Sequence, residues 1–374
     1  MLKSYILVII NKGMVKLSSY SVFLPSYSVG ADAYDKVKKI CSNYGKTIIV
    51  IGGKTSMEKA KEKIKAAISD SQLEILNFVW YGGDSSFENV EMLKKNLLVH
   101  KADMIFAVGG GRAVDTCKVL AHGLNKPLFT FPTIASNCAP CTSVCVIYDN
   151  KGVFKELYFI DKPADHAFIC TEIIAQAPKV FLWAGIGDAL SKQYECTFSS
   201  RNDELEHFNA LGVQISKICT EPLLKNGKKA LDDCDANIVS YELEQVALDI
   251  IISTGLVSNL VINDYNSCLA HSIYYGMTGL KQIEKNHLHG EIVAYGVLIL
   301  LVCDKQYEEL AKVYKFCKSI GLPTKLVDLE VSKEELGPVI KKATETADIV
   351  HVPYKITYKM IEDSILELEK YEGK

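Results

Sequence analysis

One aspartate and two histidines in this chain of 374 residues have the residue types and the spacing of a metal site. Asp188 ends the motif Gly185-Ile-Gly-Asp188, while His271 and His289 belong to two later segments with helical periodicity. Two imidazoles and one carboxylate on separate helices form a common site for a divalent transition metal with an open coordination position. Two simpler interpretations stay open: Asp188 could cap a helix, and a single helical histidine is more often a core or surface residue.

A glycine-rich turn is the second feature that could do chemistry. The apolar run Met104–Val108 leads into Gly109, Gly110 and Gly111, and a helical pattern follows. Glycines let a ligand approach the backbone, and the free amides at a helix start attract an anion, so the turn suits a pyrophosphate. It matches neither the G-x-G-x-x-G pattern nor the Walker A pattern, and turns of this kind are also common as purely structural connections.

The elements that would position the glycine turn alternate between short apolar runs and helical patterns up to about residue 170. Helices are expected at Ser56–Ser69 and Phe87–His100. This alternation predicts an α/β domain whose parallel sheet is covered by helices on both faces. The expected strands are Thr47–Ile51, Leu76–Trp80, Met104–Val108, Pro127–Phe131 and Val144–Tyr148.

After about Thr171 the 3.6-residue period dominates, which predicts an all-α domain. Pro178 lies between the two patterns, and proline tends to close one element and open the next. We therefore expect two domains, residues 1–177 and residues 178–374, in keeping with the length of the chain. The expected helices are Phe181–Ser199, Glu204–Leu224, Val239–Leu260, Asn266–Met277, Glu291–Asp304, Tyr307–Ser319, Lys333–Thr346 and Tyr358–Tyr371.

The composition is that of a folded globular protein, with 48% hydrophobic and 23% charged residues and a net charge of −3. It lacks the basic surplus that nucleic acids or anionic membranes require of a partner. The apolar run Tyr5–Ile10 is too short for a signal-peptide core or a membrane span, so a cytoplasmic protein is expected, starting at either Met1 or Met14. Twelve cysteines are far below the density of a disulfide scaffold, and we expect most of them to be reduced and buried.

Several linked motifs together resemble the iron-containing (group III) alcohol dehydrogenase superfamily and, within it, the glycerol dehydrogenase-like branch. The resemblance covers nearly the whole chain from about Phe23, and the order and spacing of the motifs are hard to obtain by chance. The motifs are Val108-Gly-Gly-Gly-Arg-Ala-Val-Asp115, Pro132-Thr-Ile-Ala-Ser136, Val146-Ile-Tyr148, Thr171-Glu-Ile-Ile-Ala-Gln-Ala-Pro178, Gly185-Ile-Gly-Asp188, Ala270-His271 and His289-Gly-Glu-Ile-Val-Ala294.

The resemblance implies an oxidoreductase with a Rossmann-like N-terminal domain, a helical C-terminal domain, and a cleft that holds NAD(P) and one Zn²⁺ or Fe²⁺. It implies that Asp188, His271 and His289 are the metal ligands. Such a metal holds the substrate oxygen as a Lewis acid while a hydride passes between the substrate carbon and the nicotinamide ring. A small-molecule substrate and a homo-oligomer are expected on the same ground. The implied cofactor contacts are Gly109, Gly110, Gly111, Asp115, Thr133, Ser136, Thr142, Val144 and Tyr148.

The chain departs from the glycerol dehydrogenase pattern near the substrate. Cys138 stands where those enzymes carry an aspartate close to the substrate hydroxyls, and a thiol is a poor substitute for a carboxylate acceptor. The Asn-Cys-Ala sequence at this point is more similar to the hydroxycarboxylate (2-oxoacid) dehydrogenase branch. Lys192, one helical turn after Asp188, could receive a substrate carboxylate or could simply face solvent. Tyr274 and Tyr275 replace the His-Asn pair that commonly follows the first ligand histidine.

The choice between NAD and NADP stays open, because no acidic residue follows Ile51 before Glu58 to bind the ribose hydroxyls. Lys54 and the hydroxyls of Thr55 and Ser56 could instead accept a 2′-phosphate, so we expect NADPH to be used at least as well as NADH.

Cys138 and Cys141 form a C-x-x-C pair, but a redox role is less favoured because the pair does not open a helix as in thioredoxin-like units.

Three alternatives to a 2-hydroxy acid or 2-oxoacid dehydrogenase remain from the sequence. A true glycerol dehydrogenase is possible if Asn137 or a water takes over from the missing aspartate. A lyase similar to dehydroquinate synthase would share the fold, the NAD and the metal. A catalytically silent, cofactor-binding relative is favoured by the altered substrate loop and disfavoured by the intact ligand set.

Overall fold

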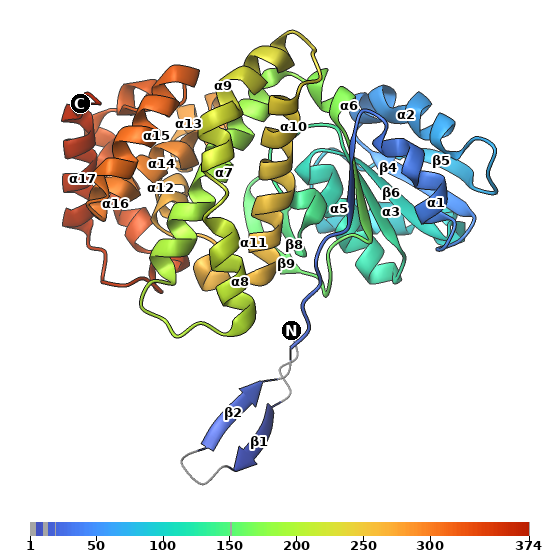
Figure 1. Cartoon of the computed structure of the whole chain (residues 1–374), viewed down its shortest axis with the longest axis horizontal. Coiled ribbons are helices and arrows are strands. Elements are labelled where there is room, and N and C mark those ends of the chain that lie inside the picture. Colours follow the sequence, from blue (N-terminus) through green and yellow to red (C-terminus); the bar gives the residue numbers. More distant parts are fainter. Residues whose placement is uncertain (1–4, 10–13, 19, 150–151, 374) are drawn as a thin grey trace.

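A six-stranded, fully parallel sheet forms the centre of the N-terminal half in this computed structural model, which describes residues 5–9, 14–18, 20–149 and 152–373 (Figure 1). The strand order is β3-β10-β7-β6-β4-β5, so consecutive strands are joined by crossovers and not by hairpins. The α/β fold predicted for this half is confirmed. The strands are β3 (Tyr27–Gly30), β4 (Thr47–Gly52), β5 (Glu74–Trp80), β6 (Met104–Gly109), β7 (Leu128–Pro132) and β10 (His166–Cys170).

Helices cover both faces of this sheet because its central strands are apolar on both sides. In β4, Ile48 and Val50 pack with one hydrophobic cluster, while Ile49 and Ile51 pack with the cluster on the opposite face. The first cluster is shared with α1 (Val37–Cys41) and α2 (Lys54–Ile68), and the second with α3 (Phe87–Lys94), α4 (Leu97–Lys101) and α5 (Gly111–Leu124). The expected single helix Phe87–His100 is therefore two helices, because Asn96 caps the second one by accepting from the amide of Leu98.

Two predictions about the sheet were wrong. Val144–Tyr148 is a strand, β8, but it pairs antiparallel with β9 (Phe154–Phe159) in a separate two-stranded sheet. The short connection between these strands allows a hairpin but not the crossover that a parallel neighbour needs. The strands β3 and β10, which complete the parallel sheet at one edge, were not predicted at all.

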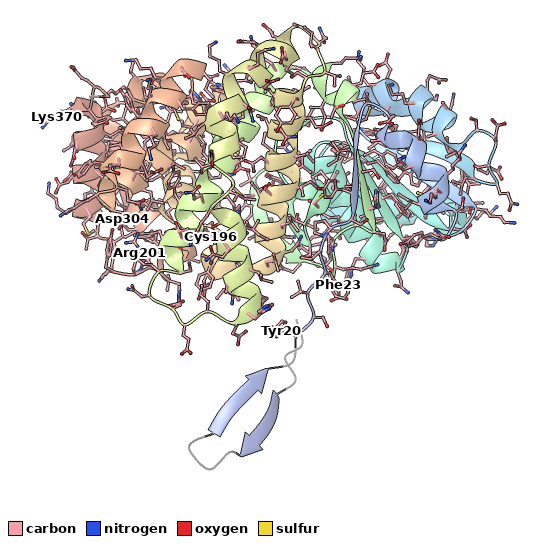
Figure 2. All side chains as sticks on the ribbon, viewed as in Figure 1. Tyr20, Phe23, Cys196, Arg201, Asp304 and Lys370 are labelled. Carbon is pink, nitrogen blue, oxygen red and sulfur yellow. The ribbon has the colours of Figure 1, made fainter. Side chains whose placement is uncertain are left out.

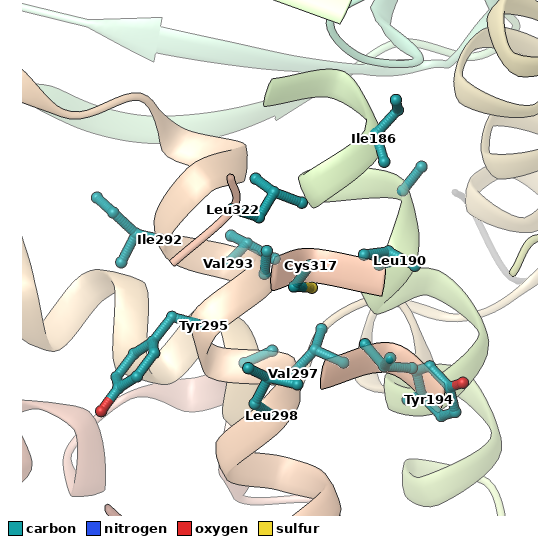
Figure 3. Packing of buried hydrophobic residues seen from close by; sticks show 14 of the residues in the cluster. Ile186, Leu190, Tyr194, Ile292, Val293, Tyr295, Val297, Leu298, Cys317 and Leu322 are labelled. Carbon is teal, nitrogen blue, oxygen red and sulfur yellow. The ribbon is translucent and has the colours of Figure 1, made fainter. Parts of the chain in front are cut away.

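The C-terminal half is helical, as predicted, and begins with α7, whose N-cap is Pro178. Its centre is the contact between α7 and α14, where apolar side chains of both helices interdigitate (Figure 3). Helix α14 is apolar and buried on all sides, which is the pattern of a core helix. The short helix α6 (Thr171–Ala175) precedes Pro178. The helices after it are α7 (Lys179–Ser199), α8 (His207–Ser216), α9 (Glu221–Asp235), α10 (Tyr241–Leu248), α11 (Thr254–Leu260), α12 (Leu269–Met277), α13 (Lys281–Asn286), α14 (His289–Cys303), α15 (Tyr307–Ile320), α16 (Leu336–Thr344) and α17 (Tyr358–Lys370).

Two of the expected long helices are interrupted. The segment Glu204–Leu224 is not one helix, because α8 ends at Ser216 and Pro222 opens α9 at its first turn. The segment Val239–Leu260 is α10 followed directly by a π-helical turn, Asp249–Ser253, and then α11. Single π-turns inside α-helices are frequent near functional sites.

This interrupted helix, Tyr241–Leu260, is the one candidate membrane span among the described residues, with a mean hydropathy of 1.2. Of its most apolar window, 61% is buried inside the protein, where the helix packs against α8 and α9. Its apolar character is therefore explained by packing within the helical half.

An N-terminal hairpin, an ion pair between two helices and the mostly buried cysteines complete the fold. The apolar run near the N-terminus forms β1 (Tyr5–Ile9), which pairs with β2 (Met14–Ser18) in a hairpin that projects from the body (Figure 1). Near the lower edge of the helical half in Figure 2, Arg201 donates to Asp304 at 2.9 Å and ties the end of α7 to the end of α14. Ten of the twelve cysteines are buried, as expected, and only Cys138 and Cys303 are partly exposed.

Candidate metal and cofactor site

Asp188, His271 and His289 lie together, although they come from three different helices. One ligand atom from each lies within 4.8 Å of the others, and among the described residues this is the one group of three or more such side chains. The Nε2 atoms of His289 and His271 lie 3.2 Å and 3.7 Å from Oδ1 of Asp188. Asp188 lies in the middle of α7, so it does not cap a helix. A carboxylate and two imidazoles at this spacing suit a divalent metal with an open position.

Small residues at a helix crossing bring Asp188 and His289 together. At Gly187 on α7, an added Cβ would collide with the backbone carbonyl of Gly290 on α14, and at Gly290 it would collide with the carbonyl of Ala184. The two helix backbones are therefore in direct contact where the two ligands project. The glycines of the Gly185-Ile-Gly-Asp188 motif thus serve the packing of α7.

A buried glutamate that sequence reasoning missed holds His271. Nδ1 of His271 donates to Oε2 of Glu195 at 2.6 Å, and Glu195 is fully buried. Burial alone would lower the pKa of His271, but the carboxylates of Glu195 and Asp188 outweigh this effect and raise the pKa to about 10. Against the effect of burial, the two histidines hold the pKa of Asp188 well below its usual range. The available signal was spacing, because Glu195 follows Asp188 by two helical turns on the same face.

The glycine turn lies at the carboxyl ends of the central strands, where ligands bind in open α/β sheets. Gly109 has a φ of +149°, which favours glycine, and Gly110 is the N-cap of α5 without a side-chain cap. The start of α5 therefore presents backbone amides that can bind an anion. Thr133 follows β7 and Ser56 lies in the first turn of α2, and their hydroxyls lie 3.2 Å apart beside this turn.

Asp115 lies one turn further along α5, where it holds the segment that leads into β8. Its carboxylate lies 2.8 Å from Nζ of Lys118 and accepts from the amide of Val146 at 3.0 Å. Lys118 is fully buried and also donates to the carbonyl oxygens of Thr142 and Val144. This buried pair fixes β8 against α5, so Asp115 positions Thr142 and Val144.

Tyr148 and Ser136, two further implied cofactor contacts, pack against different elements. The guanidinium of Arg112 stacks over the ring of Tyr148 at 4.8 Å. Ser136 packs against α7, because an added Cβ at Gly185 would lie 3.0 Å from the Cα atom of Ser136. From the helical half, Tyr274 meets the ring of His289 edge-on, with the ring centres 4.3 Å apart. Ser136, from one of the cofactor motifs, therefore lies against α7 less than one turn before Asp188.

Cys138 and Lys192 lie beside the metal group. Cys138 precedes a short 3-10 turn, Ala139–Cys141, and an added Cβ at Gly255 would touch its Cβ at 3.5 Å. Burial raises the pKa of the Cys138 thiol, and the nearby charge of Lys192 partly opposes this effect. Lys192 is 8% exposed, so it does not face solvent, and its ammonium donates to the backbone and side-chain oxygens of Asn266.

Lys54 contacts the edge strand of the sheet. It is the first residue of α2, and its ammonium lies over the ring of Trp80 at 4.8 Å, at the end of the edge strand β5. This cation–π contact holds the lysine at the carboxyl edge of the sheet.

The sequence matches a family model and several dehydrogenases of known family. Residues 25–165 match the family model described as iron-containing alcohol dehydrogenase. The glycerol dehydrogenase of Thermotoga maritima is 32% identical over 94% of this chain and 97% of its own length. The hydroxycarboxylate dehydrogenase A of Escherichia coli K12 is 29% identical over 86% of this chain and 89% of its own length.

A solved structure extends the similarity to three dimensions. The glycerol dehydrogenase of Schizosaccharomyces pombe superposes with a TM-score of 0.83 at 26% identity, covering 94% of this chain and 91% of that one. The similarity thus includes both the sheet and the helical half.

Proposed function

The chain belongs to the iron-containing alcohol dehydrogenase family, in its glycerol dehydrogenase-like branch, and on this premise we propose which metal site, cofactor site and substrate it uses. It is a metal-dependent, NAD(P)-linked oxidoreductase that acts on a small alcohol or ketone. The observation that carries the assignment of the site is the convergence of Asp188, His271 and His289 within ligand distance of one another.

Asp188, His271 and His289 would hold the divalent metal, either Zn²⁺ or Fe²⁺, since two imidazoles and one carboxylate suit both ions. The donor set fits, because Glu195 occupies Nδ1 of His271 and leaves Nε2 directed toward Asp188. When bound, such a metal supplies a Lewis acid that polarises the substrate oxygen.

The cofactor would lie along the carboxyl edge of the sheet. The amides at the start of α5, from Gly109 to Gly111, would bind its pyrophosphate. Thr133, Ser136 and Tyr148 would contact the cofactor between that turn and the metal ligands. Asp115 would keep Thr142 and Val144 in place through Lys118 and the amide of Val146. The bound cofactor supplies hydride transfer, and these residues orient it.

A 2-oxoacid or the corresponding 2-hydroxy acid is the substrate that the surroundings of the metal favour. Lys192 places a buried cation one helical turn from Asp188, and a buried cation recognises a carboxylate. Cys138, the other neighbour, cannot offer the strong acceptor that a polyol needs. The similarity to a hydroxycarboxylate dehydrogenase supports the same substrate class.

A true glycerol dehydrogenase is the second candidate, favoured by the similarity to the Thermotoga maritima enzyme. In this case Asn137 or a water would replace the missing aspartate. The side-chain oxygen of Asn137 already accepts from the amide of Ala139 at 3.1 Å, which leaves its amide group as the part that could bind a substrate hydroxyl. The assembled ligand group argues against a silent, merely cofactor-binding relative.

The remaining expectations are part of the same proposal. We place the boundary between the two domains at residues 177 and 178, where α7 begins after Pro178. A homo-oligomer in the cytoplasm and at least equal use of NADPH complete the proposal. Lys54 supports the use of NADPH because it provides a cation at the carboxyl edge of the sheet.

A substrate panel tests the proposal. Glycerol, 1,2-propanediol, 2-oxobutyrate and other 2-oxoacids are offered with NADH or NADPH, or their oxidised forms, after loading with Zn²⁺ or Fe²⁺. Reduction of 2-oxoacids well above oxidation of polyols supports the proposal, whereas efficient glycerol oxidation supports the second candidate. Binding of NAD(P) without any turnover would identify a silent relative.

A further inference from the structure

Glu195 is a fully buried carboxylate that belongs neither to the metal group nor to the implied cofactor contacts. It lies on α7, two helical turns after Asp188, at the point where α7 faces the start of α12. A buried carboxylate is costly unless its oxygens are fully hydrogen-bonded, so its contacts indicate what it does.

Both oxygens of Glu195 bind the beginning of α12. Oε1 accepts from the backbone amides of Cys268 and His271, at 2.7 Å and 3.0 Å. The N-cap residue of α12 is Cys268, which provides no side-chain cap of its own. Glu195 therefore caps α12 from a neighbouring helix. The cap fixes the position of the first turn of α12, which carries His271.

The second oxygen of Glu195, Oε2, determines which ring nitrogen of His271 carries a hydrogen-bonded proton. Nδ1 of His271 donates to Oε2 at 2.6 Å, and the opposite nitrogen, Nε2, points to Asp188. Because Oε2 holds the proton on Nδ1, Nε2 is the nitrogen whose lone pair becomes available to a metal, once a metal displaces its proton, in the group formed with Asp188 and His289. His289 differs, because the described contacts place no carboxylate on its Nδ1 and its side chain is 42% exposed.

We propose that Glu195 is a positioning residue for the metal: it caps α12 and holds His271 as the Nδ1–H tautomer with Nε2 facing the metal position. This inference rests on the proposed function, since it assumes that the group binds a metal. Hydrogen-bond partners of ligand histidines typically contribute 10- to 100-fold to metal affinity.

The test compares Zn²⁺ binding by metal-free wild-type protein, Glu195→Gln and Glu309→Gln, measured by competition with a chromophoric chelator. Glu309, on α15, is the control because its carboxylate also accepts a hydrogen bond from a residue of α7. The donor is Tyr194, which is not a metal ligand. We expect the Zn²⁺ dissociation constant of Glu195→Gln to rise about 10- to 100-fold, and that of Glu309→Gln to stay within about twofold of wild type.

Two further measurements separate positioning from mere support of the fold. In Glu195→Gln/Cys268→Ser, the serine can cap α12 from its own N-cap position, so folding is expected to recover while the loss of Zn²⁺ affinity persists. In the Zn²⁺-loaded proteins, ¹⁵N NMR of the histidine rings is expected to show Nδ1–H for His271 in wild type and a changed signal in the variants.

Unchanged Zn²⁺ affinity and an unchanged His271 signal in Glu195→Gln would overturn the proposal, as would full recovery of affinity in the double variant. Failure of the proposed function gives a different result, because the wild-type protein itself would then bind no Zn²⁺.

Discussion

The ammonium of Lys192 donates to the side-chain oxygen of Asn266 at 2.8 Å, inside the helical half and one turn from Asp188. This contact fixes a cation that would otherwise be a flexible side chain. In the proposed function, this fixed, buried cation would favour a carboxylate substrate over a polyol.

Replacement of Lys192 by methionine should therefore reduce the use of carboxylate substrates selectively. A hydrogen bond to a charged group contributes about 1.5–3 kcal/mol, so kcat/KM for 2-oxobutyrate should fall about 10- to 100-fold in Lys192→Met. Turnover of an uncharged ketone, such as hydroxyacetone, should change little. Equal losses for both substrates in steady-state kinetics would show that Lys192 does not read the carboxylate.

The crossing of α7 and α14 predicts a second effect. Gly290 has no room for a methyl group against the carbonyl of Ala184, so Gly290→Ala must push the two helices apart. Overpacking of this kind costs about 1–3 kcal/mol of unfolding free energy, and the shift should also weaken metal binding because His289 is the neighbouring residue. Gly279→Ala is the matched control, since an added Cβ there meets nothing within 4 Å. Thermal unfolding and metal titration of both variants check the prediction, and wild-type behaviour of Gly290→Ala would refute it.

Asp249, in the π-helical turn, predicts a pH dependence of stability. The residue is 3% exposed, and burial raises its pKa to about 8. Between the ordinary pKa of an aspartate, about 3.9, and this value, the folded state holds a proton that the unfolded state has lost. Unfolding free energy should therefore fall as pH rises through this window, with a limiting slope of about 1.4 kcal/mol per pH unit from this group.

Asp249→Asn removes the titratable carboxyl group and so isolates its contribution to the pH dependence of stability. We expect the variant to be more stable than wild type at pH 7 to 8, with the difference vanishing toward pH 4. Urea unfolding at several pH values measures it. A constant difference across the range would mean that Asp249 titrates normally in the folded protein.

The cation at Lys54 predicts the cofactor preference. Lys54→Glu should lower kcat/KM for NADPH by at least about tenfold relative to NADH, because a carboxylate there would repel a 2′-phosphate. Lys61→Glu is the control, since Lys61 lies on the same helix and stacks over Phe78 in a similar way. If both variants, or neither, shift the ratio of the two cofactors, Lys54 does not select between them.

The sequence predicted the central strands well because their apolar runs are buried on both faces, as in β4 and β6. It missed the edge strand β3 and its neighbour β10, whose pairing depends on distant contacts. His166 at the start of β10, for example, bonds to Ser26 and Ser28, and such a contact leaves no local pattern. Val144–Tyr148 was correctly predicted as a strand but placed in the wrong sheet, because alternation identifies a strand and not its partner.

In the site, too, residues with a recognisable sequence motif were predicted, and residues whose role depends on distant contacts were not. Asp188, His271 and His289 were predicted as a common group only because the family motifs singled them out among 45 acidic residues and eight histidines, and the fold does bring the three together. Glu195 could not be found in this way, because its role depends on the contact between α7 and α12. The sequence left the burial of Lys192 open for the same reason, as only the fold places Asn266 over its ammonium.

Turnover and metal content, measured together in metal-loaded wild-type protein and in Asp188→Asn, test the metal site most directly, with His100→Ala as a surface-histidine control. We expect wild type and His100→Ala to hold about one divalent ion per chain and to convert a 2-oxoacid with stoichiometric oxidation of NADPH or NADH. Asp188→Asn, like His271→Ala, should lose both the metal and the turnover. A metal-free Asp188→Asn protein that turns over at the wild-type rate would show that these residues do not form a catalytic metal site.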